Sequence, residues 1–365
     1  MFDSEELLAR ILESFHGREG KPFMLELRPT NRCNLWCPSC VARGHPSQMP
    51  LGEELSLEEY MRIIDEAAEM GVRYVQVTGG GEPFLRKDMP EIMQRIKERG
   101  MSGLVVTNGT LFDLSTVHRI FGMGWDALLF SVDGHEAALN DTLRSKNGSF
   151  HRATGAIREF SRLKKAYGTN TPRLDIGPVL SHCNCRYICD LVRLGADLGA
   201  DNVLFQPVRV PEIGAPLRLT PDDEKFLLEE IPKAVRFAEQ LGIRTNLSQL
   251  DKDMIGKSSE LPEVIRSYSS TYTHPWLSIH CFSPWYYLGI NPDGTVGPCS
   301  IHDDLTYIHN VRGKSLQEIW KSEQFRAFRA GLAGGDLPRT CERCCGTNVL
   351  AIHKIREGLK QVISA

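Results

Sequence analysis

The stretch FMLELRPTNRCNLWCPSC, residues 23–40, indicates the fold that the rest of the chain must fit. Its start, Phe23 to Pro29, has the largely apolar pattern of a buried strand. Three cysteines follow at the spacing C-x3-C-x2-C: Cys33, Cys37 and Cys40. This spacing would place the thiols on one helix face, as buried thiols often pack, but Pro38 inside the triplet would break that helix. We therefore predict a cysteine-bearing loop at the carboxyl end of the first strand.

Strands and helices alternate about six times after that loop, over roughly 230 residues. This order predicts a parallel α/β sheet with right-handed crossovers. Six units are fewer than the eight of a closed TIM barrel, so we expect a partial (βα)6 TIM-like barrel, with an open doubly wound sheet as the alternative. The expected strands lie at 23–29, 73–78, 103–109, 126–134, 173–180, 202–208 and 243–248, and the expected helices at 56–71, 89–99, 114–121, 151–167, 186–198 and 226–241.

The periodicity fails after about residue 250, which suggests three segments. We predict an N-terminal helical extension at 1–21, the partial barrel at 22–250 and a small C-terminal cysteine-rich module at 251–365. Within the last segment, 251–280 looks irregular and 281–365 carries a few short elements. The chain of 365 residues is long enough for one large and one small domain.

Composition excludes several classes of function. Hydrophobic residues make up 41% and charged residues 24%, which is ordinary for a globular protein. The net charge of −3 favours neither nucleic acid nor an anionic membrane as a partner. No apolar run approaches the roughly 18 residues of a membrane helix, and the acidic N-terminus lacks the features of a secretory signal. We therefore expect a cytoplasmic protein.

Eleven cysteines in a chain expected in a reducing compartment point to metal binding rather than disulfides. The thiols of Cys33, Cys37 and Cys40 lie within eight residues and indicate one metal centre. A zinc ion would need a fourth ligand, for which His45 is a candidate. An iron–sulfur cluster takes four cysteines, so three would leave one iron open to a substrate or cofactor.

Small polar residues follow the next strands, on the edge where the active face of a parallel sheet lies. The second strand runs into Gly79-Gly80-Gly81-Glu82-Pro83, where glycines would let the backbone approach a ligand. The third strand ends near Asn108, and the fourth near Ser131 and Asp133. Each could serve only as a turn former or helix cap, but together they surround one face.

Taken together, CNLWCPSC, TGGGEP, VVTNG and FSVDG resemble the motifs of the radical S-adenosylmethionine (SAM) enzymes over about residues 22–250. The resemblance implies a [4Fe–4S] cluster on Cys33, Cys37 and Cys40, with its open iron chelated by the amino and carboxylate groups of SAM. It also implies SAM contacts from a set of residues after the strands: Gly79, Gly80, Gly81, Glu82, Pro83, Asn108, Ser131, Arg144 and Gln206. One departure is that Ser39, and not an aromatic residue, precedes the third cysteine, while Trp36 precedes the second.

The C-terminal cysteines resemble the auxiliary-cluster modules called SPASM or twitch. Cys281 and Cys299 enclose the pattern C-x12-G-x4-C, and CERCC follows at 341–345. The resemblance implies one auxiliary [4Fe–4S] cluster on Cys281, Cys299, Cys341 and Cys344, with Cys345 as an alternative to Cys344. A zinc ribbon is the alternative by spacing. A cluster with four protein ligands would accept or relay electrons, or stabilise the module.

Three more cysteines, Cys183, Cys185 and Cys189, lie at a predicted strand–helix junction. The simpler interpretation is buried thiols. The alternative is that Cys183 or Cys185 donates a hydrogen atom, as in some epimerases of this family. His280, Tyr286, His302 and Asp303 lie near the auxiliary cysteines in sequence, but none is assigned a catalytic role.

The resemblance implies an enzyme that generates a 5′-deoxyadenosyl radical, supplied with electrons by a flavodoxin- or ferredoxin-type donor. Because only about 21 residues precede the first strand, we expect a small sugar or nucleoside-type substrate, with a maturase or epimerase of a ribosomally made peptide as the alternative. A non-catalytic iron–sulfur carrier is a third hypothesis, which the glycine-rich loop disfavours. Oxidation, epimerisation, decarboxylation, dehydration and cross-linking all stay open as net reactions.

Overall fold

The computed structural model describes residues 4–18, 20–40, 54–208, 216–250, 255, 271–300, 309–336, 341 and 349–364. Its centre is a ten-stranded sheet in which eight successive strands are parallel, seven of them from the first 250 residues. These seven strands are, in order, β1 (Met24–Leu27), β2 (Tyr74–Val77), β3 (Ser102–Thr107), β4 (Ala127–Phe130), β5 (Arg173–Ile176), β7 (Asn202–Val203) and β9 (Arg244–Thr245).

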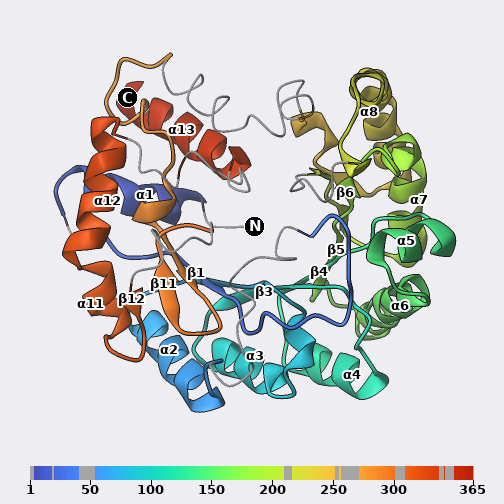
Figure 1. Ribbon diagram of the computed structural model, residues 1–365, viewed down its shortest axis with the longest axis horizontal. Helices are drawn as coiled ribbons and strands as arrows, with labels where there is room; N and C mark the ends of the chain where they lie inside the picture. The colour runs from blue at the N-terminus through green and yellow to red at the C-terminus, as the bar shows by residue number, and fades with distance from the viewer. Residues whose placement is uncertain are drawn as a thin grey trace.

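Helices cover the outer face of this sheet, and the strands follow an open arc (Figure 1). Alternate strand residues such as Leu25, Leu27, Val75 and Val77 are fully buried in the main apolar core against these helices. The edge strands β12 and β9 do not pair, so the barrel is partial, as the sequence predicts. The helices are α2 (Leu57–Glu69), α3 (Met89–Glu98), α4 (Leu114–Gly122), α5 (Ala137–Arg144), α6 (Ser149–Tyr167), α7 (Ile188–Leu198) and α8 (Pro221–Leu241).

Two expected strands are each divided in the structure. The predicted strand 173–180 splits into β5 and β6 (Val179–Leu180), because Pro178 has no N–H for the sheet. The predicted strand 202–208 splits into β7 and β8 (Gln206–Pro207). The second halves, β6 and β8, pair with each other in a separate parallel sheet.

Helix boundaries also differ from the expectation at two places. Helix α8 begins at Pro221 and not at Phe226, since Thr220 and Asp223 form a capping box and Pro221 occupies the first turn. Helix α5 was not predicted at all. The expected capping box of Ser56 and Glu59 at the start of α2 is confirmed.

The C-terminal segment extends the same sheet. Strand β10 (Tyr287–Ile290) lies parallel to β1, with Met24 opposite Tyr287. Strands β11 (Thr295–Gly297) and β12 (His309–Asn310) continue from it in antiparallel order. Helices α11 (Leu316–Trp320), α12 (Glu323–Gly334) and α13 (Val349–Ser364) follow, and the last two are longer than the short elements expected there.

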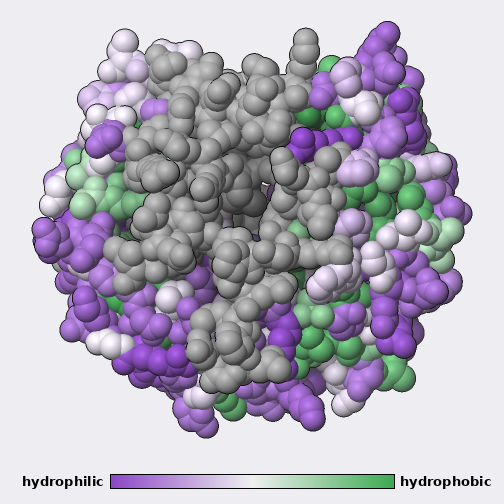
Figure 2. All heavy atoms as spheres, viewed as in Figure 1, coloured by the Kyte–Doolittle hydropathy of each residue, from purple (hydrophilic) through white to green (hydrophobic). Residues whose placement is uncertain are grey.

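A second apolar core joins the two ends of the chain. Helix α1 (Ser4–Phe15) contributes Leu7 and Ile11, which pack with Ile352 and Leu359 of α13. Phe23 and Met24 belong to the same core, which therefore lies on the face of β1 opposite the main core. The predicted boundaries of the three segments, near 21 and 250, stay predictions. No helix in the described ranges is long and apolar enough to cross a membrane, and hydrophilic residues predominate on much of the rim (Figure 2).

Candidate active site

The cysteine loop leaves the carboxyl end of β1 as predicted, and its described residues up to Cys40 contain no helix. Cys33 is exposed, whereas Cys37 and Cys40 are half-buried. The Cys40 N–H donates to the Cys37 carbonyl at 3.2 Å, which turns the loop back on itself. Burial raises the pKa of the Cys37 thiol, and the nearby Arg144 guanidinium acts in the opposite direction. Among the described residues, no three His, Cys, Asp or Glu side chains lie close enough together to hold a single metal ion.

The glycine-rich loop after β2 packs directly on the start of the cysteine loop. The Gly81 N–H donates to the Thr30 carbonyl at 3.0 Å, and the Glu82 N–H donates to the Arg32 carbonyl at 2.8 Å. A Cβ atom on Gly81 would lie 1.9 Å from the Arg32 carbonyl oxygen, and one on Gly80 would lie 2.1 Å from an Asn31 oxygen. At Gly81 the neighbouring atom is backbone, so only glycine allows this approach, whereas at Gly80 it is the side chain of Asn31. Gly79 to Gly81 therefore stabilise the cysteine loop as well as lining the strand end.

Glu82 points inward and joins the second loop to the third. Its side chain is 2% exposed, and its carboxylate accepts hydrogen bonds from the Thr107 hydroxyl and the Asn108 N–H, both at 2.7 Å. A third bond comes from the Phe84 N–H at 3.2 Å, where Pro83 begins a short 3-10 helix, η1 (Pro83–Leu85). Burial raises the pKa of Glu82, and these hydrogen bonds oppose that shift. The Glu82 carboxylate thus already accepts hydrogen bonds from the protein. A ligand at this loop would therefore contact the loop's backbone.

Asn108 lies at the third strand end and binds the cysteine loop through Asn34. The Asn108 amide donates to the Asn34 side-chain oxygen at 2.9 Å, and Asn34 donates to the Thr110 hydroxyl at 2.8 Å. Thr110 in turn donates to the Asn108 oxygen at 2.7 Å. These three side chains thus form a closed ring of hydrogen bonds that fixes Asn34, the residue next to Cys33. Asn34 and Thr110 were not predicted, although Asn34 lies inside the quoted motif CNLWCPSC and Thr110 directly follows VVTNG.

Arg144, at the end of α5, brings a buried positive charge to the cysteine loop. Its guanidinium forms an ion pair with Asp133 at 2.9 Å and lies 3.9 Å from the Cys37 sulfur. Asp133 also accepts a hydrogen bond from the Val179 N–H at 2.8 Å. Asp133 keeps the pKa of Arg144 above its ordinary value despite burial, so the guanidinium stays charged. Its buried Nε–H has no hydrogen-bond partner among the described residues, which leaves a donor for an anionic group beside Cys37.

The remaining predicted SAM contacts lie at strand ends on the same edge. Ser131 directly follows β4, and its N–H donates to the Thr107 carbonyl at 2.9 Å. Gln206 is exposed on β8, where its N–H donates to the Pro178 carbonyl at 3.1 Å. Ser131 is therefore joined to the third strand end, while no described contact links Gln206 to the cysteine loop.

The auxiliary cysteines come from separate elements. Cys281 precedes a 3-10 turn, η5 (Ser283–Trp285), and its sulfur accepts a hydrogen bond from the Ser283 N–H at 3.5 Å. Cys299 follows β11, and Cys341 packs with Cys281 on the second apolar core. Burial raises the pKa of the neighbouring Tyr286. Cys344, Cys345, His302 and Asp303, like His45, lie outside the described residues.

Of the three cysteines at 183–189, Cys185 contacts Asp223 at the start of α8. Cys185 is fully buried, its thiol donates to Asp223 at 3.4 Å, and burial raises its pKa to about 12. His182 shares Asp223 through a contact of 2.6 Å, which the sequence did not reveal. Cys183 is exposed, and Cys189 lies 3.8 Å from Glu230. Cys185 is therefore a buried thiol, and the hypothesis that Cys183 or Cys185 donates a hydrogen atom stays a prediction.

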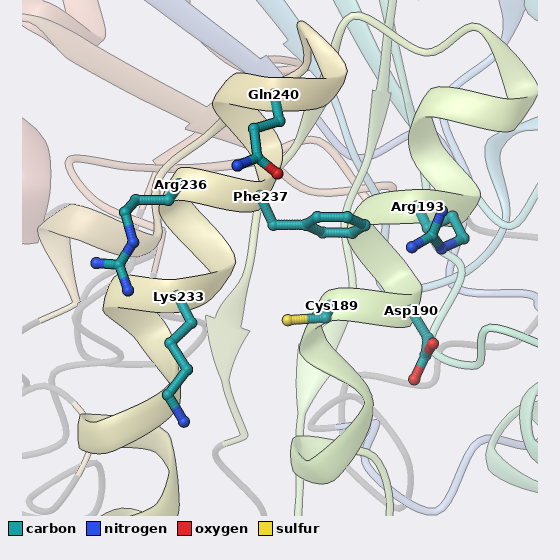
Figure 3. Close-up of a pocket in the computed structure, with 7 residues that line it drawn as sticks. All are labelled: Cys189, Asp190, Arg193, Lys233, Arg236, Phe237 and Gln240. Atoms are coloured by element: carbon teal, nitrogen blue, oxygen red, sulfur yellow. The ribbon is translucent and has the colours of Figure 1, made fainter.

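A pocket of about 350 Å³ lies between α7 and α8 (Figure 3). Arg193 packs over the Phe237 ring at 4.7 Å, and Cys189 points from α7 toward α8. The pocket belongs to the outer helical layer and contains none of the strand-end residues described above. The other lining residues are Asp190, Lys233, Arg236 and Gln240.

Comparison with known families agrees with this geometry. A family model described as the radical SAM superfamily matches residues 27–178, from β1 to just beyond β5. The chain therefore contains a radical SAM domain. A second model, the SPASM iron–sulfur cluster-binding domain, matches residues 281–345. These matches confirm the family and the enzyme class that the sequence predicts. They also confirm the predicted cofactors, which are SAM and a [4Fe–4S] cluster for the first domain and an auxiliary iron–sulfur cluster for the second.

Among characterised radical SAM relatives, the PqqA peptide cyclase of Granulibacter bethesdensis is 27% identical over 330 residues, which cover 88% of this chain and 79% of that protein. The Fe-coproporphyrin III synthase of Methanosarcina barkeri is 34% identical over 151 residues, or 41% of this chain and 36% of that protein. The crystal structure of Streptococcus suis SuiB bound to SAM shares the fold, with a TM-score of 0.64, 17% identity, and coverage of 92% of this chain and 73% of that one. SuiB has also been crystallised with its precursor peptide SuiA, with a TM-score of 0.61 to this chain, 17% identity and the same coverage.

Proposed function

We propose that this radical SAM enzyme modifies a ribosomally made peptide. The observation that carries the proposal is the similarity to PqqA peptide cyclases, which extends over 88% of the chain. The fold shared with SuiB, whose precursor peptide is SuiA, supports the same substrate class. The comparisons thus favour the peptide alternative over the expected sugar or nucleoside-type substrate.

The proposed cluster ligands at the first site are Cys33, Cys37 and Cys40. The residues present fit a cluster with an open iron: three thiols share one loop, and the buried Nε–H of Arg144 points to a place for the SAM carboxylate beside Cys37. The backbone of Gly79 to Gly81 is proposed to contact the methionine amino group, and Glu82 and Pro83 to fix that loop. Asn108 and Ser131 complete the proposed SAM site, with Gln206 at its margin.

The bound cofactors would supply a 5′-deoxyadenosyl radical that takes a hydrogen atom from a substrate carbon. The protein's own part is to orient the cofactors and the substrate and to enclose the site. Arg144 balances negative charge at Cys37, Glu82 holds the second strand end to the third, and Asn108 fixes the loop through Asn34. These contacts keep the strand-end loops in one arrangement, which positioning of a radical requires.

The second proposed centre uses Cys281, Cys299, Cys341 and Cys344. With four protein ligands it would hold no open iron, so its proposed role is to accept an electron from the substrate radical. This favours a net oxidation, such as a carbon–carbon cross-link in the peptide that releases two hydrogen atoms. A flavodoxin- or ferredoxin-type electron donor and a cytoplasmic location stay predictions.

The test combines anaerobically reconstituted protein, SAM and dithionite with the short peptides encoded beside its gene. The expected result is a product two mass units lighter than one of those peptides. Deuterium placed on the reacting residue should appear in 5′-deoxyadenosine, because that carbon–hydrogen bond is the one broken. If every peptide returns unchanged while a nucleoside diphosphate sugar is consumed, the substrate proposal fails.

A further inference from the structure

Arg28 connects the two cysteine-bearing regions. It follows β1 directly, five positions before Cys33, and it is 2% exposed. One guanidinium nitrogen donates to the Ser300 carbonyl at 2.9 Å, next to Cys299. The other donates to the Asn291 side-chain oxygen at 2.9 Å, in the turn between β10 and β11. A single side chain therefore contacts both ends of the hairpin that leads to Cys299.

The charge of Arg28 is compensated on the same face of β1. Glu26 is 5% exposed, and its carboxylate lies 2.6 Å from the Arg28 guanidinium. Side chains alternate along a strand, so Glu26 and Arg28 lie opposite Leu25 and Leu27, whose side chains fill the main core. Their face is the inner one, where Met24 packs in the second core. The segment Cys299–Ser300 is consequently held over the inner face of the sheet.

The geometry of this contact requires an arginine. The planar guanidinium presents several N–H donors in fixed directions, and here three oxygens from three segments receive them. A lysine ammonium would pair with Glu26 but would not span the hairpin in the same way. The Arg28 N–H also donates to the Ile290 carbonyl at 3.0 Å, which holds the backbone at the same place.

We propose that Arg28 is a positioning residue that fixes Cys299 of the auxiliary centre relative to the loop of Cys33. This rests on the proposed function in one respect, the assignment of Cys299 as an auxiliary ligand. Strands β1 and β10 pair in parallel, and the buried Arg28 side chain spans the hairpin that follows β10. The path between the two centres would therefore have a fixed length. Loss of Arg28 would alter the environment of the auxiliary centre without removing any ligand.

The test uses a chain in which Cys33, Cys37 and Cys40 are all alanine, so that only the auxiliary centre titrates. This background should hold about four irons per chain. Adding R28Q should change the g-values of the reduced centre and lower its reduction potential, since a nearby cation is lost while Glu26 stays. The double change E26Q with R28Q removes the pair without leaving a buried charge. Its spectrum should also differ from that of the background, because the contacts to Asn291 and Ser300 are lost.

The matched control is R86Q, because Arg86 is also buried and paired, with Asp88 at 2.7 Å. It contacts Pro29 and Leu55 and none of the hairpin residues, so R86Q should lower the melting temperature but leave the auxiliary spectrum unchanged. If R28Q and the double variant retain the background's iron, spectrum and potential, the positioning role is wrong. If the double variant alone regains the spectrum, charge and not position is responsible, which also contradicts it. A background without iron would overturn the auxiliary assignment itself, which is a different observation.

Discussion

The two cysteine sets differ in how the chain assembles them. Cys33, Cys37 and Cys40 lie on one loop, and polar side chains from three further strand ends surround it. Cys281, Cys299 and Cys341 come from segments up to 60 positions apart, and two of them pack on an apolar core. A local set with polar neighbours and an uncommitted buried N–H leaves room for a cofactor. The C-terminal cysteines come together only when the C-terminal segment folds, so the proposed electron-accepting centre depends on that folding.

The largest expected effect comes from replacing proposed ligands of the auxiliary centre. C281A with C299A should reduce iron from about eight to about four per chain, because only the first cluster would remain. Peptide product should fall to background, measured by mass spectrometry beside an iron assay. A C189A chain is the matched control and should retain iron and product, since Cys189 lies with Glu230 in the outer helices. Retention of all the iron by the double variant would contradict the assignment.

The next effect concerns the charge at the first site only. R144M should weaken SAM binding by roughly 10- to 100-fold, because a charge-assisted contact of about 1.5–3 kcal/mol is lost. Titration of SAM into the reconstituted protein, followed by the perturbed spectrum of the cluster, measures this. R144M with D133N controls for the carboxylate left unpaired. Unchanged SAM affinity in both variants would mean that Arg144 stabilises the fold and does not bind the cofactor.

A smaller effect shows whether Glu82 stabilises the fold or binds SAM directly. E82Q should lower the free energy of unfolding by about 1–3 kcal/mol, because the amide nitrogen cannot accept the hydrogen bonds that the carboxylate accepts. Urea denaturation measures this, with exposed E98Q as a control that should change stability by less than about 0.5 kcal/mol. SAM affinity should stay near the parent value. A large loss of SAM affinity with unchanged stability would make Glu82 a direct cofactor ligand.

The smallest effect lies away from both sets and depends on pH. Burial would raise the pKa of Asp223, but hydrogen bonds from His182 and Thr220 outweigh it and hold the pKa well below 3.8. The ionised carboxylate therefore stabilises the fold above pH 4, and this contribution is lost as pH falls toward the lowered pKa. D223N should cost about 1–3 kcal/mol at pH 7 and progressively less in acid, by urea denaturation at each pH. A cost that does not vary with pH would contradict the account.

Sequence patterns were sufficient where the signal is local. The alternation of strands and helices predicts the parallel partial barrel, and Pro38 alone converts a helical cysteine spacing into a loop. The capping box at Ser56 is also readable from four residues. The division of the strand at 173–180 follows from Pro178, which is local, but the partner that β6 then meets is not local, because β8 lies some 27 positions later.

Contacts between distant segments were not predictable in the same way. Nothing near residue 28 indicates Ser300, and nothing near Glu82 indicates that its carboxylate binds Thr107 and Asn108. The pairing of β10 with β1, which joins the C-terminal segment to the barrel, has no signal in either strand. The comparisons favour the peptide alternative over the expected sugar or nucleoside-type substrate, and the length of chain before the first strand carries little chemistry with which to choose between them.

The most direct measurement is 5′-deoxyadenosine formation by two variants side by side. One has Cys33, Cys37 and Cys40 replaced by alanine, and the other has Cys281 and Cys299 replaced. Each is reconstituted and given SAM and dithionite without peptide, so that only cleavage of SAM is scored. We predict no 5′-deoxyadenosine from the first variant and formation at the parent's rate from the second. Formation by the first, or its absence from a second variant that still holds about four irons, would contradict the division of roles between the two cysteine sets.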